Sequence, residues 1–236
     1  MSPLRQINKI HSTLCSISPR GDKGLTIKVI VTGFDAFGGN TVNPSSEAVA
    51  KLPSIVKFDD KSEAATVAKL TLPTCCSAAW AMLEPEVEQE QNYDFAVLLA
   101  GLAENRDKIC LERFALNVRH FRIPDNNGHQ WEEDFVCEGA PDAIRSKLEI
   151  SELTKHLNGI GYAADISHNA GTFVCNETYF RSLHRWQNNP RCRGVLFVHF
   201  PPYERYRHSN PEKQDARNKA DIYAQSLEEI IKLVLR

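Results

Sequence analysis

The sequence lacks any long hydrophobic run and has almost no excess of charge. No stretch approaches the roughly 18 consecutive apolar residues that a membrane-spanning helix requires. The formal net charge is −2, so we expect neither a nucleic acid nor a membrane surface as a partner. An apolar fraction of 42% over 236 residues suits one sizeable globular domain.

The sequence also lacks the common signatures of metal and phosphate binding. It has no C-x-x-C pair, no H-E-x-x-H motif, and no glycine-rich loop followed by Gly-Lys-Ser/Thr. Its seven cysteines are odd in number and irregularly spaced, which is typical of free thiols in a reducing compartment. We therefore expect a cytoplasmic protein with no metal and no cofactor.

Residues 1–26 differ in composition from the rest of the chain. Arg5, Lys9, Arg20 and Lys23 are accompanied by a single acid, Asp22, and several serines lie between them. The segment lacks the apolar core of a secretory signal. We predict that residues 1–26 form a basic, disordered extension, an organelle-targeting segment being the alternative, and that residues 27–236 form the functional domain.

Strand-like and helix-like segments alternate along this domain. The alternation predicts an α/β fold, with a single three-layer α/β/α domain and a mostly parallel, twisted sheet. Ligands of such sheets bind beyond the carboxyl ends of the strands, where we place Gly33, Gly101, Ala170–Gly171 and His199. The predicted strands are Leu25–Thr32, Ala64–Leu72, Asp94–Ala100, Ile109–Val118, Ala163–Ser167 and Gly194–His199, and the predicted helices are Ser45–Leu52, Cys75–Glu90, Ile150–Leu157, Val174–His184 and Asp215–Leu235.

One cysteine lies at a predicted strand-to-helix turn. Cys175 follows the break at Asn169–Gly171, and a helix N-terminus at that point favours the reactive thiolate. His199 ends a later apolar run, where it suits a general base. A thiol and a histidine so placed are what a cysteine hydrolase needs. From spacing alone, Cys175 can equally be a buried structural thiol, and His168 remains a weaker alternative base.

Two further features accompany this pair. Glu112 is a carboxylate within an apolar run, so it either faces solvent or is buried and paired, for example with an imidazole. Phe34 and Phe37 lie in the glycine-rich loop Gly33–Gly39, where they either form a flat apolar slot for a small ring or anchor the loop in the core. The glycosylation sequon at Asn176–Thr178 is interpreted as a chance match.

Several ordered blocks of the sequence resemble the type I pyroglutamyl peptidases. Their order and spacing fit that family from about residue 27 to the C-terminus. Two segments depart from it: the family usually has Gly-Gln-Ala-Gly-Gly-Arg at Gly101–Arg106, and a single proline where this chain has Pro201–Pro202. The matching blocks are Val31–Gly39, Asn43–Ser45, Leu72–Thr74, Glu112–Asn117, Arg122–Asn126, Ala170–Asn176 and Phe197–His199.

The resemblance implies a cysteine exopeptidase that removes an N-terminal pyroglutamyl residue from peptides through a thioester. It implies that Cys175 is the nucleophile, His199 the base and Glu112 the carboxylate that orients the base. It also implies peptides with N-terminal pyroglutamate as partners, and it allows a homo-oligomer. The positions that match substrate-binding residues of the family are Phe34, Phe37, Asn43, Thr74, Leu102, Ile123, Phe173 and Val174.

Two other functions on the same scaffold remain open at this stage. The departure at Gly101–Arg106 keeps open a non-catalytic protein that binds peptides with blocked N-termini. It equally keeps open a cysteine amidase that acts on another small acyl group.

Overall fold

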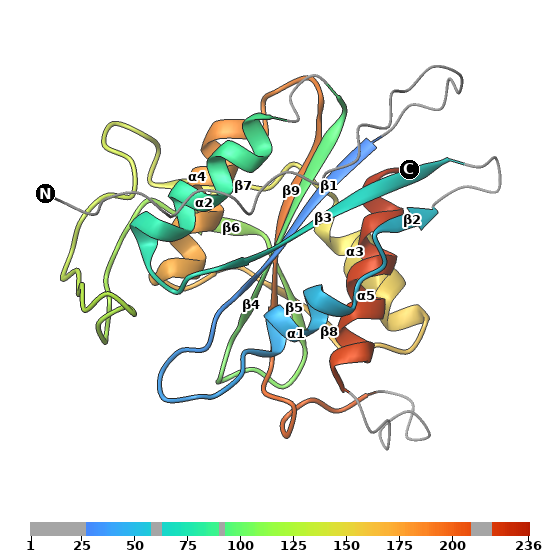
Figure 1. Ribbon diagram of the computed structural model, residues 1–236, viewed down its shortest axis with the longest axis horizontal. Coiled ribbons are helices and arrows are strands. Elements are labelled where there is room, and N and C mark those ends of the chain that lie inside the picture. Colours follow the sequence, from blue (N-terminus) through green and yellow to red (C-terminus); the bar gives the residue numbers. More distant parts are fainter. Residues whose placement is uncertain (1–26, 58–62, 90–92, 209–218) are drawn as a thin grey trace, which may run out of the picture.

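The structure is a computed structural model that describes residues 27–57, 63–89, 93–208 and 219–236 (Figure 1). The predicted extension 1–26 lies outside the described residues. Seven strands form the main sheet, in the order β2-β3-β1-β4-β9-β5-β8, and β6 and β7 form a small second sheet. The strands are β1 Ile27–Phe34, β2 Ile55–Lys57, β3 Ala64–Leu72, β4 Phe95–Leu102, β5 Ile109–Glu112, β6 Phe114–Leu116, β7 Ala143–Arg145, β8 Ala164–Ser167 and β9 Cys192–Phe200.

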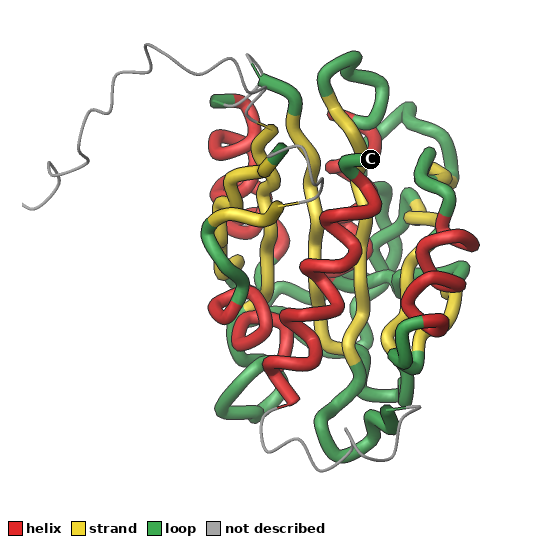
Figure 2. Tube along the Cα trace, turned by 90° about the vertical axis from the view of Figure 1, so that its right-hand side faces the viewer, coloured by secondary structure: helices red, strands yellow, loops and turns green. Residues whose placement is uncertain are grey.

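Helices cover both faces of the main sheet. Helices α2 and α4 lie on one face, and α1, α3 and α5 lie on the other, so an apolar core fills the space on each side (Figure 1). Figure 2 looks onto the second face, where α5 crosses in front of the central strands. This arrangement confirms the predicted three-layer α/β/α fold. The helices are α1 Pro44–Lys51, α2 Cys76–Glu88, α3 Ile150–Gly159, α4 Val174–Trp186 and α5 Lys219–Val234.

The central strand β4 shows how the sequence specifies this layering. Every residue of β4 except Leu102 is buried, and the strand pairs in parallel with β1 and β9. Its uninterrupted apolar sequence is therefore explained by helices on both faces, the usual environment of a parallel strand. Among the described helices, none is long and apolar enough to cross a membrane.

The sheet is mostly parallel, but the strands at its β5–β8 end point the other way. Strand β5 pairs in parallel with β8 and antiparallel with β9. The turn at Ala170–Gly171, which we expected at the same edge as His199, therefore follows a strand of opposite direction. The antiparallel pairing places Cys110 opposite His199, so Glu112, two residues further on, lies on the same face of the sheet as the histidine.

Several predicted segments have different bounds in the structure. The run Ile109–Val118 is not one strand, because it divides at Arg113 into β5 and β6, which belong to different sheets. Strands β2 and β7 were not predicted, since three residues carry too little alternation to be recognised. The predicted start of the last helix, Asp215, lies outside the described residues, and α5 is described from Lys219.

Helix α1 starts one residue earlier than predicted and closes tightly over β1. Asn43 is its N-cap, and the Asn43 side chain accepts a hydrogen bond from the Ser45 amide at 3.0 Å. A Cβ atom at Gly33 would lie only 2.6 Å from the backbone of Ser45 and Ser46. Glycine at this position therefore permits the close approach that fixes the loop between β1 and α1.

Candidate active site

Cys175 lies in the first turn of α4, directly after a sharp turn of the chain. The amide of Gly171, whose φ of 85° favours glycine, donates a hydrogen bond to Oδ1 of Asn169 at 2.8 Å. Phe173 then adopts an extended N-cap conformation and provides no side-chain cap. The first backbone N–H groups of α4 have no partner inside the helix, so they can stabilise negative charge beside the partly exposed thiol.

His199 and Glu112 form a buried pair between β9 and β5. Nδ1 of His199 lies 2.7 Å from Oε1 of Glu112, and the two side chains are 7% and 0% exposed. Oε2 of Glu112 has no hydrogen-bond partner within the described part of the chain. Tyr179, on α4, donates its hydroxyl to the backbone carbonyl of Glu112 at 2.9 Å, which fixes β5 against the helix that carries the thiol.

The charge state of His199 depends on its two neighbours. Burial by itself lowers the pKa of the imidazole, but hydrogen bonding and charge interactions with Cys175 and Glu112 outweigh burial and raise the pKa to about 9. The two neighbours therefore favour the protonated form of the imidazole. A thiol, an imidazole and a carboxylate thus form a connected chain, with the imidazole in the middle.

Gly101, near the end of β4, is the backbone neighbour of this thiol. A Cβ atom added there would lie 3.0 Å from Sγ of Cys175 and 2.9 Å from Cζ of Phe197. The Phe197 ring is fully buried and packs against Phe34, Tyr179 and His199. The thiol therefore lies directly on the backbone of β4, and only glycine leaves it enough room.

Three aromatic rings group beside the start of α4. The Phe173 ring lies 5.0 Å from the ring of Phe37 and 4.5 Å from that of Phe121. The structure separates the two phenylalanines that the sequence grouped together. Phe34 is 2% exposed and packs in the core against Phe197, whereas Phe37 is partly exposed in the loop.

Asn43 and Thr74 both bind the loop that carries Phe37. The backbone carbonyl of Asp35 accepts hydrogen bonds from Nδ2 of Asn43 at 3.0 Å and from the Thr74 hydroxyl at 3.3 Å. The Asp35 carboxylate accepts from the Thr74 amide at 2.7 Å and from Nδ2 of Asn126 at 3.2 Å. Asp35 and Asn126 were missed as site residues, although both fall within the blocks that carry the family resemblance.

The remaining predicted residues lie in different surroundings. Val174 is fully buried in the core, and Ile123 is partly exposed in the same loop as Phe121. Leu102 follows Gly101 in β4 and lines a cavity of about 380 Å³; as neighbours in a strand, the two residues face opposite sides of the sheet. The other lining residues are Asn40, Val42, Pro44, Glu104 and Pro202–Arg205.

An α/β sheet that brings a thiol at a helix start beside a buried histidine–carboxylate pair defines a cysteine-type hydrolase. The comparisons with known proteins identify the family. The family model for pyroglutamyl peptidase matches residues 27–217. The pyrrolidone-carboxylate peptidase of Thermococcus kodakarensis is 37% identical over 74% of this chain and 81% of its own length. That of Finegoldia magna is 30% identical over 89% of this chain and 93% of its own.

Solved structures agree with this assignment. The pyrrolidone carboxyl peptidase of Pyrococcus furiosus superimposes with a TM-score of 0.75 at 30% identity, covering 88% of this chain and 98% of that protein. Pyroglutamyl peptidase I of Bacillus amyloliquefaciens gives a TM-score of 0.72 at 29% identity, covering 89% and 97%. The chain belongs to the pyroglutamyl peptidase family of cysteine-type hydrolases.

Proposed function

We propose that this protein removes N-terminal pyroglutamyl residues from peptides, with Cys175 as nucleophile, His199 as general acid–base and Glu112 as the residue that orients the imidazole. The observation that carries the proposal is the connected chain of these three side chains, whose buried histidine–carboxylate link measures 2.7 Å. A buried carboxylate that pairs with a histidine beside a reactive thiol suits covalent catalysis, and simple binding does not require it.

The reaction proceeds by two acyl transfers. The Cys175 thiolate forms a bond to the pyroglutamyl carbonyl carbon, and the oxyanion that results lies near the free N–H groups at the start of α4. The carbon–nitrogen bond then breaks, and imidazolium His199 gives its proton to the leaving peptide amine. Water attacks the resulting thioester with His199 as base, which releases pyroglutamate and restores the thiol.

The chemistry of the substrate fits the surroundings of the thiol. A pyroglutamyl group is an uncharged lactam ring, so its recognition needs apolar walls and a few backbone hydrogen bonds rather than an ion pair. Phe37, Phe121 and Phe173 supply apolar walls beside the start of α4.

The domain bounds, the location in the cell and the binding partners of the protein belong to the same proposal. Residues 27–236 constitute the peptidase domain, and the protein acts in the reducing cytoplasm. Support comes from its cysteines, because every cysteine in the described residues is a free thiol. We include in the proposal that the protein binds peptides, and neither nucleic acids nor membranes. The family resemblance allows a homo-oligomer.

The test is release of a fluorogenic amine from a pyroglutamyl-amide under reducing conditions. We expect the wild type to cleave it, and Cys175→Ala and His199→Ala to lose cleavage while remaining folded. Cys192→Ala, which replaces a partly buried thiol at the start of β9, is the matched control and should retain activity. Prolyl-amide and acetyl-amide substrates test for another acyl group. A folded wild type that cleaves none of these amides would overturn the proposal in favour of a binding protein.

A further inference from the structure

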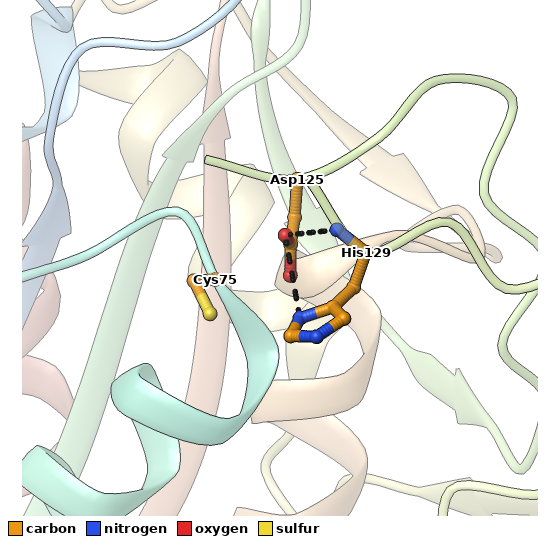
Figure 3. Close-up of side chains that lie close together, drawn as sticks. All are labelled: Cys75, Asp125 and His129. Atoms are coloured by element: carbon orange, nitrogen blue, oxygen red, sulfur yellow. Dashed lines mark hydrogen bonds and ion pairs between the residues drawn. The ribbon is translucent and has the colours of Figure 1, made fainter. Parts of the chain in front are cut away.

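A second cluster of reactive side chains lies where α2 begins. Cys75 is the N-cap of α2, and Asp125 and His129 come from the loop between β6 and β7 (Figure 3). One sulfur, one carboxylate oxygen and one ring nitrogen from these three residues all lie within 4.8 Å of one another. None of the three belongs to the proposed catalytic machinery.

The carboxylate of this cluster is already held in place. Asp125 is 1% exposed, and its Oδ1 accepts hydrogen bonds from the amides of Asn127 at 2.9 Å and His129 at 3.0 Å. Nδ1 of His129 lies 3.9 Å from the same oxygen. Figure 3 marks this ion pair and the hydrogen bond from the His129 amide with dashed lines. The carboxylate is thus fixed beside the imidazole before any ligand arrives.

The donor set matches a borderline-soft divalent cation. Zinc binds thiolate, imidazole and carboxylate, and a thiolate with a carboxylate balances its two positive charges. Bonds of about 2.0–2.3 Å in a tetrahedral site separate neighbouring ligand atoms by roughly 3.3–3.8 Å, so ligand atoms up to 4.8 Å apart need to approach by at most about 1.0–1.5 Å. His129 is 64% exposed, so its side chain is free to make this movement and leaves a fourth position open to water.

We propose that Cys75, Asp125 and His129 form a binding site for a zinc ion. Sequence motifs do not reveal such a site, because its ligands come from segments 50 residues apart and lack zinc-finger spacing. The site joins the start of α2 to the loop between β6 and β7. The residues next to its ligands, Thr74 and Asn126, both bind Asp35, so the metal would fix one wall of the proposed substrate pocket.

The inference is tested in the Cys175→Ala variant, because the catalytic thiol and histidine can themselves bind zinc. Equilibrium dialysis with Zn²⁺ measures stoichiometry and affinity, and Co²⁺ serves as a spectroscopic probe whose near-ultraviolet charge-transfer band requires a thiolate ligand. Cys75→Ser and His129→Gln remove one ligand each. Cys192→Ser and His156→Gln are the matched controls, since they change the same residue types elsewhere in the fold.

We expect one equivalent of Zn²⁺ to bind and the Co²⁺ band to appear. Removing either ligand should weaken binding by more than the ~10–100-fold that follows loss of an outer-shell partner of a metal site. His129→Gln changes an exposed side chain, so this variant stays informative even if Cys75→Ser fails to fold. Absence of binding, or binding that both ligand variants retain, would overturn the site. Because the parent variant is inactive by design, neither result depends on the proposed peptidase activity.

Discussion

The replacement Gly101→Ala tests whether contact with the β4 backbone positions the proposed catalytic thiol of Cys175. The added methyl group would lie 3.0 Å from Sγ of Cys175 and 2.9 Å from the Phe197 ring, both well inside ordinary contact distance. Phe197 is fully buried among other aromatic side chains, so making room at its ring strains the core. The thiol is partly exposed at the start of a helix, so it is the group that the methyl displaces most easily.

The size of the effect follows from this geometry. Moving a reacting atom by about 1 Å costs on the order of 100-fold in rate, so a shift of several tenths of an ångström should lower kcat/KM by about 4- to 10-fold. Overpacking of the core should cost a further ~1–3 kcal/mol in the free energy of unfolding. Substrate binding should change less than kcat, because the methyl group does not enter the aromatic pocket.

The assay combines steady-state kinetics on a pyroglutamyl-amide with urea denaturation. Gly194→Ala is the matched control: its Cβ would meet the Leu148 side chain at 2.7 Å, which overpacks β9 away from the thiol. Gly194→Ala should lose stability and keep its kinetics. If Gly101→Ala has the kcat/KM of the wild type, or if both variants lose activity in proportion to stability, the reasoning about thiol position is wrong.

Three other replacements probe separate parts of the site. Glu112→Gln removes the negative charge beside His199, whose pKa is about 9, so the basic limb of the kcat/KM profile should move down by about 1 pH unit or more. Phe173→Ala should raise KM roughly 10-fold in the same assay and change kcat less, because it removes an apolar wall of the pocket. Asn176→Ala should cost ~2–4 kcal/mol in urea denaturation, because the fully buried Asn176 amide makes three hydrogen bonds to the β6 region.

Each of these replacements has a matched control on the surface. Glu152→Gln on α3 should leave the pH profile unchanged, Phe135→Ala at a 56% exposed ring should leave KM unchanged, and Asn188→Ala should cost little stability. An unmoved basic limb in Glu112→Gln would contradict the role given to that carboxylate. A Phe173→Ala variant that loses kcat alone, or an Asn176→Ala variant no less stable than Asn188→Ala, would contradict the other two.

The sequence pattern predicts an element correctly where the local sequence alone determines its structure. The run Ala64–Leu72 alternates and forms a strand with those bounds, and the wholly apolar β4 was recognisable as a buried strand. Cys175 and His199 were recognisable as candidates because a turn or strand end placed each of them in a distinctive local setting. The buried Asn176 also confirms that its glycosylation sequon is a chance match.

The pattern does not predict features that depend on contacts between segments far apart in the sequence. Nothing within Ile109–Glu112 indicates that this strand pairs antiparallel with β9, because direction is set by the partner strand. From the sequence alone Glu112 could therefore be exposed, and only the family resemblance favoured a buried role. The cluster of Cys75, Asp125 and His129 is likewise a product of the tertiary fold.

The antiparallel pairing of β5 with β9 has a consequence for the proposed catalytic residues. Only Cys110 with His199 and Leu111 with Val198 are paired across it, whereas β4 and β9 are paired along eight positions. Glu112 therefore meets His199 across a much shorter ladder than the one that holds β9 to β4. A change that loosens this short pairing would separate the carboxylate from the imidazole while the β4–β9 pairing, and with it the position of the histidine, is retained.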